Sequence, residues 1–197
     1  GSPNDLLLPA SYGTDISQSS TKSVEFDGVD DYLNIDKSVI NGLNTAAICC
    51  WFYADDITTQ QYFISFPDNT GGTNGTDIYI NAGQVRSTLK NLATSTSLSG
   101  VISINEWYNV VVVATGTTHK LYLNGALIDS AANDTNTSPI DTSADILQIG
   151  RFGTYGAYFN GSIDNVGIYD KALTQAEVTR QYNGGQPIDL GIDKASD

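Results

Sequence analysis

The stretch RFGTYGAYFNGSIDNVGIYD, residues 151–170, decides most of what the sequence predicts about fold and function. Its second half, residues 160–170, places apolar residues around Asp164 and indicates a buried strand near the end of the domain, with a bulge at Gly167. Its first half, residues 151–159, alternates aromatic residues with glycine and other small residues. That pattern predicts a loop ahead of the strand, and loops on a rigid scaffold are where binding residues gather.

Strand-like runs also occur upstream and are separated by clusters of turn-forming residues. These runs are SVEF, DYLNI, AAICCWFYA, YFISF, DIYINA, WYNVVVVA, HKLYLNGALID, ILQIG and SIDNVGIYD. Regular short strands at this spacing predict an all-β sandwich or barrel. Asn124-Gly125 predicts a hairpin turn, because a type I′ turn needs a positive φ at both central positions. Trp51 and Trp107 fall within strand patterns, so we expect both in the core.

The segment LTQAEVTRQYNGG is the exception to the strand pattern. Thr174 predicts a helix N-cap, and Glu177 three residues later completes a capping box. Gly184 and Gly185 then end the helix. The sequence therefore predicts an all-β protein with one short C-terminal helix.

Composition excludes several classes of partner. The chain carries 22 acidic and 9 basic side chains, so its net charge of −13 opposes binding to nucleic acid or to anionic membrane surfaces. No apolar run approaches the roughly 20 residues of a membrane-spanning helix, and we expect no membrane insertion. Cys49 and Cys50 are adjacent and point to opposite faces of a strand, which argues against a disulfide between them.

The ends of the chain differ in composition from its middle. Residues 1–22 are rich in Ser, Thr, Gly and Pro, and residues 186–197 are polar and acidic after Pro187. Both segments are typical of linkers. We therefore expect one domain, residues 23–185, that is joined to flanking domains of a longer chain.

Four motifs in order carry a resemblance to a known family. They are SVEFDGVDDYLNI, TAAICCWFYADD, NEWYNVVVVATGTTHKLYLNGALID and LQIGRFGTYGAYFNGSIDNVGIYDKALTQAEV. Together they resemble the laminin-G-like, concanavalin A-type jelly rolls of the lectin/glucanase superfamily, over roughly residues 23–183. The resemblance implies a sandwich of two antiparallel sheets, often with a structural calcium ion. It also implies a carbohydrate- or protein-binding role within an extracellular or surface assembly.

Enzymes exist on the same sandwich, so catalytic residues need to be considered. Retaining glycosidases use two carboxylates about 5 Å apart, but Glu25, Glu106 and Glu177 are scattered along the chain and no paired carboxylate motif appears. The single histidine, His119, lies on a hairpin strand where we expect it at the surface and without a partner base. We therefore predict a protein that is not an enzyme.

The segment DGVDD, residues 27–31, has two interpretations. Asp-Gly turns are common between strands, so turn chemistry alone can explain it. Alternatively, clustered carboxylates and turn carbonyls are the ligands that calcium prefers. Because the resemblance places the first strands beside the GSID strand, Asp27, Asp30 and Asp164 are the expected ligands of a structural calcium ion.

The aromatic loop before the last strand also has two interpretations. Its rings can cover the edge of the sandwich, or they can form a binding platform. Tyrosine faces stack on sugar rings, and an arginine supplies a planar set of donors. The expected ligand-binding residues are Arg151, Phe152, Tyr155 and Tyr158.

Two hypotheses of function follow. The first is a non-catalytic, lectin-like module that binds carbohydrate at one rim of the sandwich. The second is a structural domain of a phage virion or bacterial surface assembly whose partners are host or neighbouring surface proteins. The unpaired cysteines and the two linker-like ends favour a virion part assembled in a reducing cytoplasm. Either hypothesis predicts an extracellular, cell-surface or virion location, with a role in adhesion.

Overall fold

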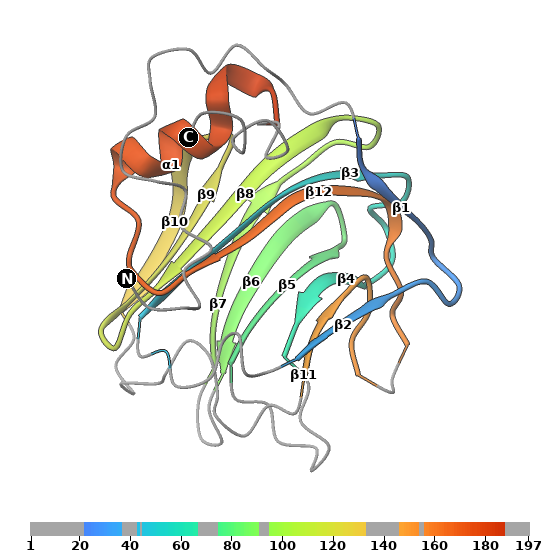
Figure 1. The fold of residues 1–197 in the computed structure, drawn as a ribbon, viewed down its shortest axis with the longest axis horizontal. Helices are drawn as coiled ribbons and strands as arrows, with labels where there is room; N and C mark the ends of the chain where they lie inside the picture. The colour runs from blue at the N-terminus through green and yellow to red at the C-terminus, as the bar shows by residue number, and fades with distance from the viewer. Residues whose placement is uncertain are drawn as a thin grey trace, which may run out of the picture.

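The computed structural model describes residues 22–36, 43, 45–66, 75–90, 95–132, 146–153 and 156–187. These residues form two six-stranded antiparallel sheets, stacked one beneath the other (Figure 1). The order of the first sheet is β1 (Val24–Asp27), β12 (Asn160–Tyr169), β3 (Ala46–Ala54), β8 (Trp107–Ala114), β9 (Thr118–Leu123) and β10 (Ala126–Ala132). The order of the second is β2 (Leu33–Asp36), β11 (Ile146–Ile149), β4 (Gln61–Ser65), β5 (Gly75–Asn81), β6 (Gln84–Lys90) and β7 (Ser95–Val101). The predicted jelly-roll sandwich is confirmed.

Strand β3 is buried on both faces, and its alternation divides the core in two. Cys50 and Phe52 point into the space between the sheets, where Phe52 stacks on Phe63 with ring centroids 4.8 Å apart. Cys49 points the other way, into a smaller cluster on the outer side of the first sheet. Burial raises the pKa of the Cys49 thiol to about 12. The two thiols are free and lie on opposite faces, as the sequence predicts.

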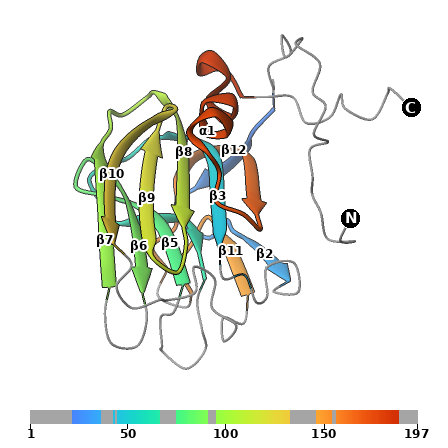
Figure 2. The ribbon, with the colours of Figure 1, turned by 90° about the vertical axis from the view of Figure 1, so that its left-hand side faces the viewer.

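Helix α1 (Gln175–Tyr182) closes that outer cluster near one end of β3, β8 and β12 (Figure 2). The predicted capping box is present, with Thr174 and Glu177 each accepting a hydrogen bond from the other's backbone N–H. Val178 is buried against the sheet, and Tyr182 stacks on Trp51 at a centroid distance of 5.8 Å. A short 3-10 turn, η2 (Asn183–Gly185), follows. No helix in the described ranges has the length and apolar character needed to span a bilayer.

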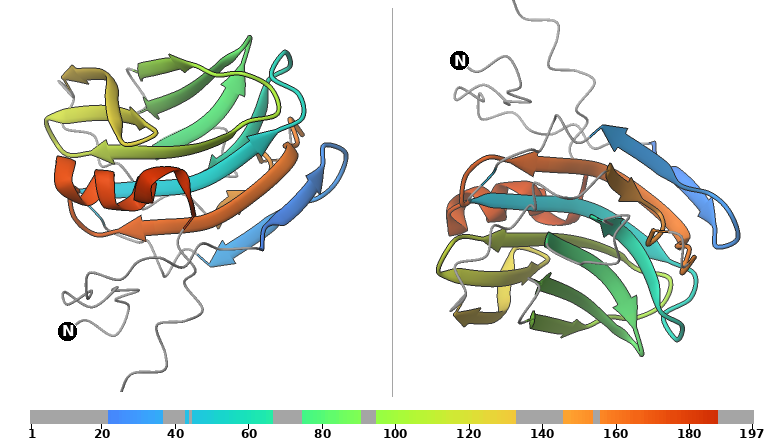
Figure 3. Two further views of the ribbon diagram at one scale, coloured as in Figure 1. Left: turned by 90° about the horizontal axis from the view of Figure 1, so that it is seen from above. Right: turned by 90° about the horizontal axis from the view of Figure 1, so that it is seen from below.

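The last strand, β12, lies between β1 and β3 and so joins the two ends of the domain. Its pairing with β3 shifts between Asp164 and Gly167, which confirms the bulge expected there. Figure 3 shows β1 and β2 running along one edge of the molecule, next to β12. The hairpin of β9 and β10 is also as predicted, with φ of 51° at Asn124 and 79° at Gly125.

Two strands were not predicted from the sequence. Strands β6 and β7 extend the second sheet beyond β5. In β6 the buried side chains at alternate positions are Val85, Ser87 and Leu89, so a polar residue interrupts the apolar pattern. A strand whose inward face includes serine carries a weak period of two, and the sequence pattern missed it for that reason.

Two expectations about burial were wrong. Trp107 is 39% exposed rather than in the core, because it begins β8 on the outer face of the sheet. His119 is 0% exposed rather than at the surface. Its Nε2 lies 2.9 Å from the Ser87 hydroxyl, so β9 of one sheet contacts β6 of the other, while its Nδ1 has no hydrogen-bond partner.

Removal from water lowers the pKa of His119 to about 4, and the negative charge of Asp129 opposes this shift.

Burial of His119 predicts a pH-dependent stability. Since its pKa is lowered from 6.5 to about 4 on folding, the unfolded chain takes up this proton first as the pH falls. The stabilisation is complete above pH 6.5 and is lost progressively towards pH 4, by up to about 3 kcal/mol. Urea unfolding at pH 7.5 and pH 4.5 should show a smaller loss of stability in His119→Gln than in the wild type.

The direct control is an NMR titration of the ring protons, which is unambiguous because His119 is the only histidine of the chain. A pKa near the ordinary value of 6.5 in the folded protein would contradict the burial described above.

Candidate functional site

Two connections cross between the sheets at the same end of the sandwich. One runs from β1 to β2, and the other runs from β11 to β12. Because Asp27 pairs with Asn160 and Leu33 pairs with Ile149, the two connections lie beside each other, at the right-hand side of Figure 1. We call residues 27–32 and the described residues of 150–160 together the rim.

The backbone where the rim leaves β11 is held from several sides. Gly150 has a φ of +90°, and a Cβ atom there would lie 2.5 Å from the ring of Phe26. No other residue type fits this close approach without displacing the ring. The Ser65 hydroxyl donates a hydrogen bond to the carbonyl of Arg151 over 2.7 Å. The start of the loop is therefore a fixed support for the Arg151 side chain.

Gln148 provides the second anchor of the loop. Its side chain is fully buried, accepts a 2.7 Å hydrogen bond from the backbone N–H of Gly153, and donates a 3.0 Å hydrogen bond to the side chain of Asn34 on β2. The backbone N–H of Phe152 donates to the carbonyl of Gly156. These contacts tie the β11–β12 loop to the strand that follows the β1–β2 turn.

Arg151 and two tyrosines form an aromatic and cationic surface on the rim. The Arg151 guanidinium carbon lies 3.6 Å from the centroid of the Tyr32 ring, a cation–π contact. The ring of Tyr158 lies 6.5 Å from that of Tyr32 and is tilted by 48°. Tyr32 is 39% exposed, and Arg151 and Tyr158 are partly exposed. The structure thus brings Arg151 and Tyr158 of the predicted set onto one surface and adds Tyr32.

The sequence analysis did not identify Tyr32, because this residue falls in the strand-like run DYLNI and is more than 100 positions away from Arg151 in the chain. Phe152, in contrast, points away from this surface and packs on Tyr62 at a centroid distance of 4.6 Å. Tyr62 in turn stacks on Tyr79 at 4.8 Å. Phe152 therefore supports the loop as an edge cover, the alternative that the sequence left open for these rings. Tyr155 lies outside the described residues.

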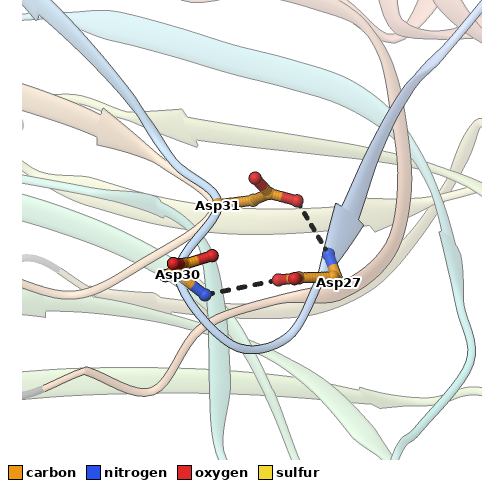
Figure 4. A group of neighbouring side chains, drawn as sticks. All are labelled: Asp27, Asp30 and Asp31. Atoms are coloured by element: carbon orange, nitrogen blue, oxygen red, sulfur yellow. Dashed lines mark hydrogen bonds between the residues drawn. The ribbon is translucent and has the colours of Figure 1, made fainter.

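The acidic turn on the other half of the rim is built by hydrogen bonds to its own backbone (Figure 4). The Asp27 carboxylate accepts from the N–H groups of Val29, at 2.8 Å, and Asp30, at 3.3 Å. The Asp31 carboxylate accepts from the N–H of Asp27 at 3.2 Å. The hydrogen bonds from Val29 and Asp30 are the main reason that the pKa of Asp27 lies below its ordinary value. Turn chemistry therefore accounts for Asp27 and Asp31.

The expected cation ligands are only partly brought together. Carboxylate oxygens of Asp27, Asp30 and Asp31 lie within 4.8 Å of one another. Asp164 does not join them, because Asn160 is the residue paired with Asp27 and Asp164 lies four positions further along β12, about 13 Å away. The expectation that Asp164 lies beside the acidic turn was wrong, because the register of β1 and β12 places Asn160 there instead. With one oxygen from each residue, the three carboxylates supply three of the six to eight oxygens that calcium takes.

Asp164 instead lines an apolar cavity of about 360 Å³ at the edge of the sandwich. The cavity lies where β1 and β2 diverge, and its walls include Val24, Phe26, Leu33 and Ile163. It is separate from the aromatic surface of the rim, since neither Tyr32 nor Arg151 lines it.

The residues with catalytic potential have structural partners. Glu177 belongs to the capping box and pairs with Lys171, and Glu106 accepts a 2.7 Å hydrogen bond from the Tyr108 hydroxyl. Ser87 and His119 lie together but are both fully buried, so a substrate has no access to them. The exposed groups of the rim are aromatic faces, one guanidinium, and carboxylates in a turn, all of which can contact a ligand.

Comparison with known proteins agrees with this geometry. The laminin G-type family model described as the concanavalin A-like lectin/glucanases superfamily matches residues 27–179, which include the whole rim. The chain belongs to this superfamily. The resemblance expected from the four sequence motifs is therefore confirmed. No curated protein matches the sequence.

Solved structures of this superfamily fold are similar to the chain at low sequence identity. The CBM40 of the Ruminococcus gnavus IT-sialidase, bound to α2,3-sialyllactose, has a TM-score of 0.68 and 21% identity, over 81% of this chain and 95% of that one. The botulinum neurotoxin serotype D ligand-binding domain, in complex with N-acetylneuraminic acid, has a TM-score of 0.67 and 17% identity, over 85% of this chain. The match covers 43% of the toxin chain, so the present chain spans less than half of the length of that toxin structure.

A third similar structure is the binding domain of botulinum neurotoxin DC in complex with rat synaptotagmin II. It has a TM-score of 0.59 and 16% identity, and the match covers 78% of this chain and 39% of that one. At these identities the similarity shows a shared fold, and the ligands named above are those of the similar proteins rather than of this chain.

Calcium at the acidic turn stays a prediction, and Asp30 gives a clean test. Its carboxylate accepts no hydrogen bond within the described part of the turn, so Asp30→Asn removes a candidate ligand without breaking the turn. Calcium at ten times its dissociation constant should raise the melting temperature of the wild type by about 3–6 °C relative to EDTA. In Asp30→Asn this rise should be largely lost.

Asp170→Asn is the matched control, because it removes the same charge at an exposed position at the far end of β12. Calcium should stabilise this control as much as the wild type. Equal melting temperatures of the wild type in calcium and in EDTA would rule out the site.

Proposed function

We propose that this domain is a non-catalytic recognition module that binds carbohydrate at the rim. The observation that carries the proposal is the surface of Tyr32, Arg151 and Tyr158, in which two aromatic rings and an arginine from the two connections of the rim lie together and are at least partly exposed. Sugar rings bind proteins through aromatic faces that contact their C–H groups and through planar donors that bind their hydroxyls. Both kinds of group are present here within one patch.

The support beneath this surface favours binding. The hydrogen bonds of Ser65 to Arg151 and of Gln148 to Gly153 hold the loop before any ligand arrives. A pre-organised loop loses little conformational entropy on binding, which matters for weakly bound ligands such as sugars. Carbohydrate binding by the similar CBM40 and toxin domains supports the same function for this chain.

Binding to a surface protein is the second candidate. The similar toxin domain in complex with synaptotagmin II is one support for it. Another is the presence of exposed apolar side chains outside the rim, including Val101, Ile104 and Trp107. Either function suits a module displayed outside a cell, on a cell surface or on a virion, within a larger protein.

A glycan panel with matched aromatic variants tests the first candidate. The purified domain should bind at least one class of glycan, and Tyr32→Ala or Tyr158→Ala should weaken that binding roughly three- to tenfold, because a stacked ring is lost. Trp107→Ala is the control, since Trp107 is 39% exposed, as Tyr32 is, but lies outside the rim on β8, two strands away from β12. Calcium and EDTA arms of the panel show whether the acidic turn contributes.

The outcomes separate the two candidates. Loss of glycan binding in the tyrosine variants, with Trp107→Ala unchanged, establishes the rim as the binding surface. If no glycan binds in either condition, carbohydrate recognition at the rim is wrong and protein binding becomes the better candidate.

A further inference from the structure

We infer that the rim selects sugars that carry a carboxylate, and that Arg151 is the residue that binds this group. The inference rests on the proposed function, because it names the ligand class of the same surface. It depends on three features of Arg151: its missing acidic partner, its fixed plane, and its position as a lone cation.

The first feature is that Arg151 has no acidic partner among the described residues. An arginine on an acidic protein ordinarily pairs with a carboxylate, yet none of the described carboxylates forms an ion pair with Arg151. Its Nε is shut off from water and has no hydrogen-bond acceptor. A ligand therefore has to use the two terminal NH2 groups of the guanidinium, which can bind the two oxygens of a carboxylate side by side.

The second feature is that the plane of the guanidinium is fixed. Tyr32 covers one face at 3.6 Å, and the Ser65 hydrogen bond holds the backbone of residue 151. A stacked guanidinium leaves its N–H edge for ligands, and that edge matches the two oxygens of a carboxylate. A sugar hydroxyl offers a single oxygen and uses this edge only in part.

The third feature is that Arg151 is the only basic residue of the rim, whose two segments read DGVDDY and GRFGTYGAYFN. Asp27 and Asp31 direct carboxylate oxygens to backbone N–H groups of their own turn, and none of the described aspartates forms an ion pair with Arg151. A carboxylate ligand therefore meets an unpaired cation on a protein whose net charge is −13, and selectivity must come from this one contact.

Carboxylates occur on two classes of sugar, the uronic acids and the sialic acids. The structure favours their shared group, and paired ligands distinguish the two sources. The probes are α2,3-sialyllactose against lactose, and trigalacturonate against its methyl ester. Titration by calorimetry or NMR should give an affinity for the acidic member of at least one pair that is about tenfold or more above that of the neutral member.

The variants assign this preference to Arg151. In Arg151→Gln the ratio of acidic to neutral affinity should fall close to one, and in Arg151→Lys it should be intermediate, because lysine keeps the charge and loses the planar edge. Arg180→Gln is the matched control, since it removes the same charge from the exposed end of α1. The ratio in this control should equal that of the wild type.

The outcomes distinguish this inference from the proposed function. If neutral and acidic members bind equally well, or if Arg151→Gln keeps the acidic preference, the inference is wrong while carbohydrate binding stands. If none of the four ligands binds and the wider panel is also negative, both fail. A preference lost in Arg151→Gln and retained in Arg180→Gln supports the inference.

Discussion

The site depends on the pairing of the last strand with the first. Because β12 lies between β1 and β3, the chain closes the first sheet with its C-terminal strand. Strand β11 similarly joins β2 in the second sheet. These two pairings bring the connection after β1 and the connection before β12 to one end of the sandwich. The contact between Tyr32 and Arg151 exists only because both pairings are made.

Charge is distributed unevenly over this small area. Backbone N–H groups of the acidic turn donate to the Asp27 carboxylate and draw its pKa down, while Arg151 has an aromatic ring as its neighbour. A cation–π contact orients a guanidinium without neutralising it. The rim thus combines hydrogen-bonded backbone with an arginine that forms no ion pair with a described carboxylate, which suits a surface that binds an anionic ligand. A strictly structural arginine would be expected to pair with one of the many carboxylates of the chain.

Local chemistry was predictable from the sequence. The hairpin at Asn124-Gly125, the capping box of Thr174 and the opposite faces of Cys49 and Cys50 each depend on residues adjacent or nearly adjacent in the chain. The family-level fold followed from the order of four strand motifs. The position of the aromatic loop also followed, since it precedes a strand that the pattern identified.

Features that depend on pairs of distant segments were not predictable. His119 is buried because β6, a strand with a polar inward residue, faces it across the sandwich. Asp164 was correctly assigned to the last strand, but it lies four positions away from the residue that pairs with Asp27. The sequence pattern could not show this, because it does not give the register between two distant strands. Tyr32 was not singled out and Phe152 was placed in the binding set for the same reason: only the folded arrangement shows which ring faces Arg151 and which packs on Tyr62.

The most direct test of the account is to map the binding surface by amide chemical shifts while the labelled domain is titrated with α2,3-sialyllactose. The account predicts that the perturbed amides cluster in residues 27–32 and 150–160, around Tyr32, Arg151 and Tyr158. Perturbations that gather instead around Trp107 on the outer face of the first sheet, or none at saturating ligand, would contradict the assignment of the rim as a carbohydrate-binding surface.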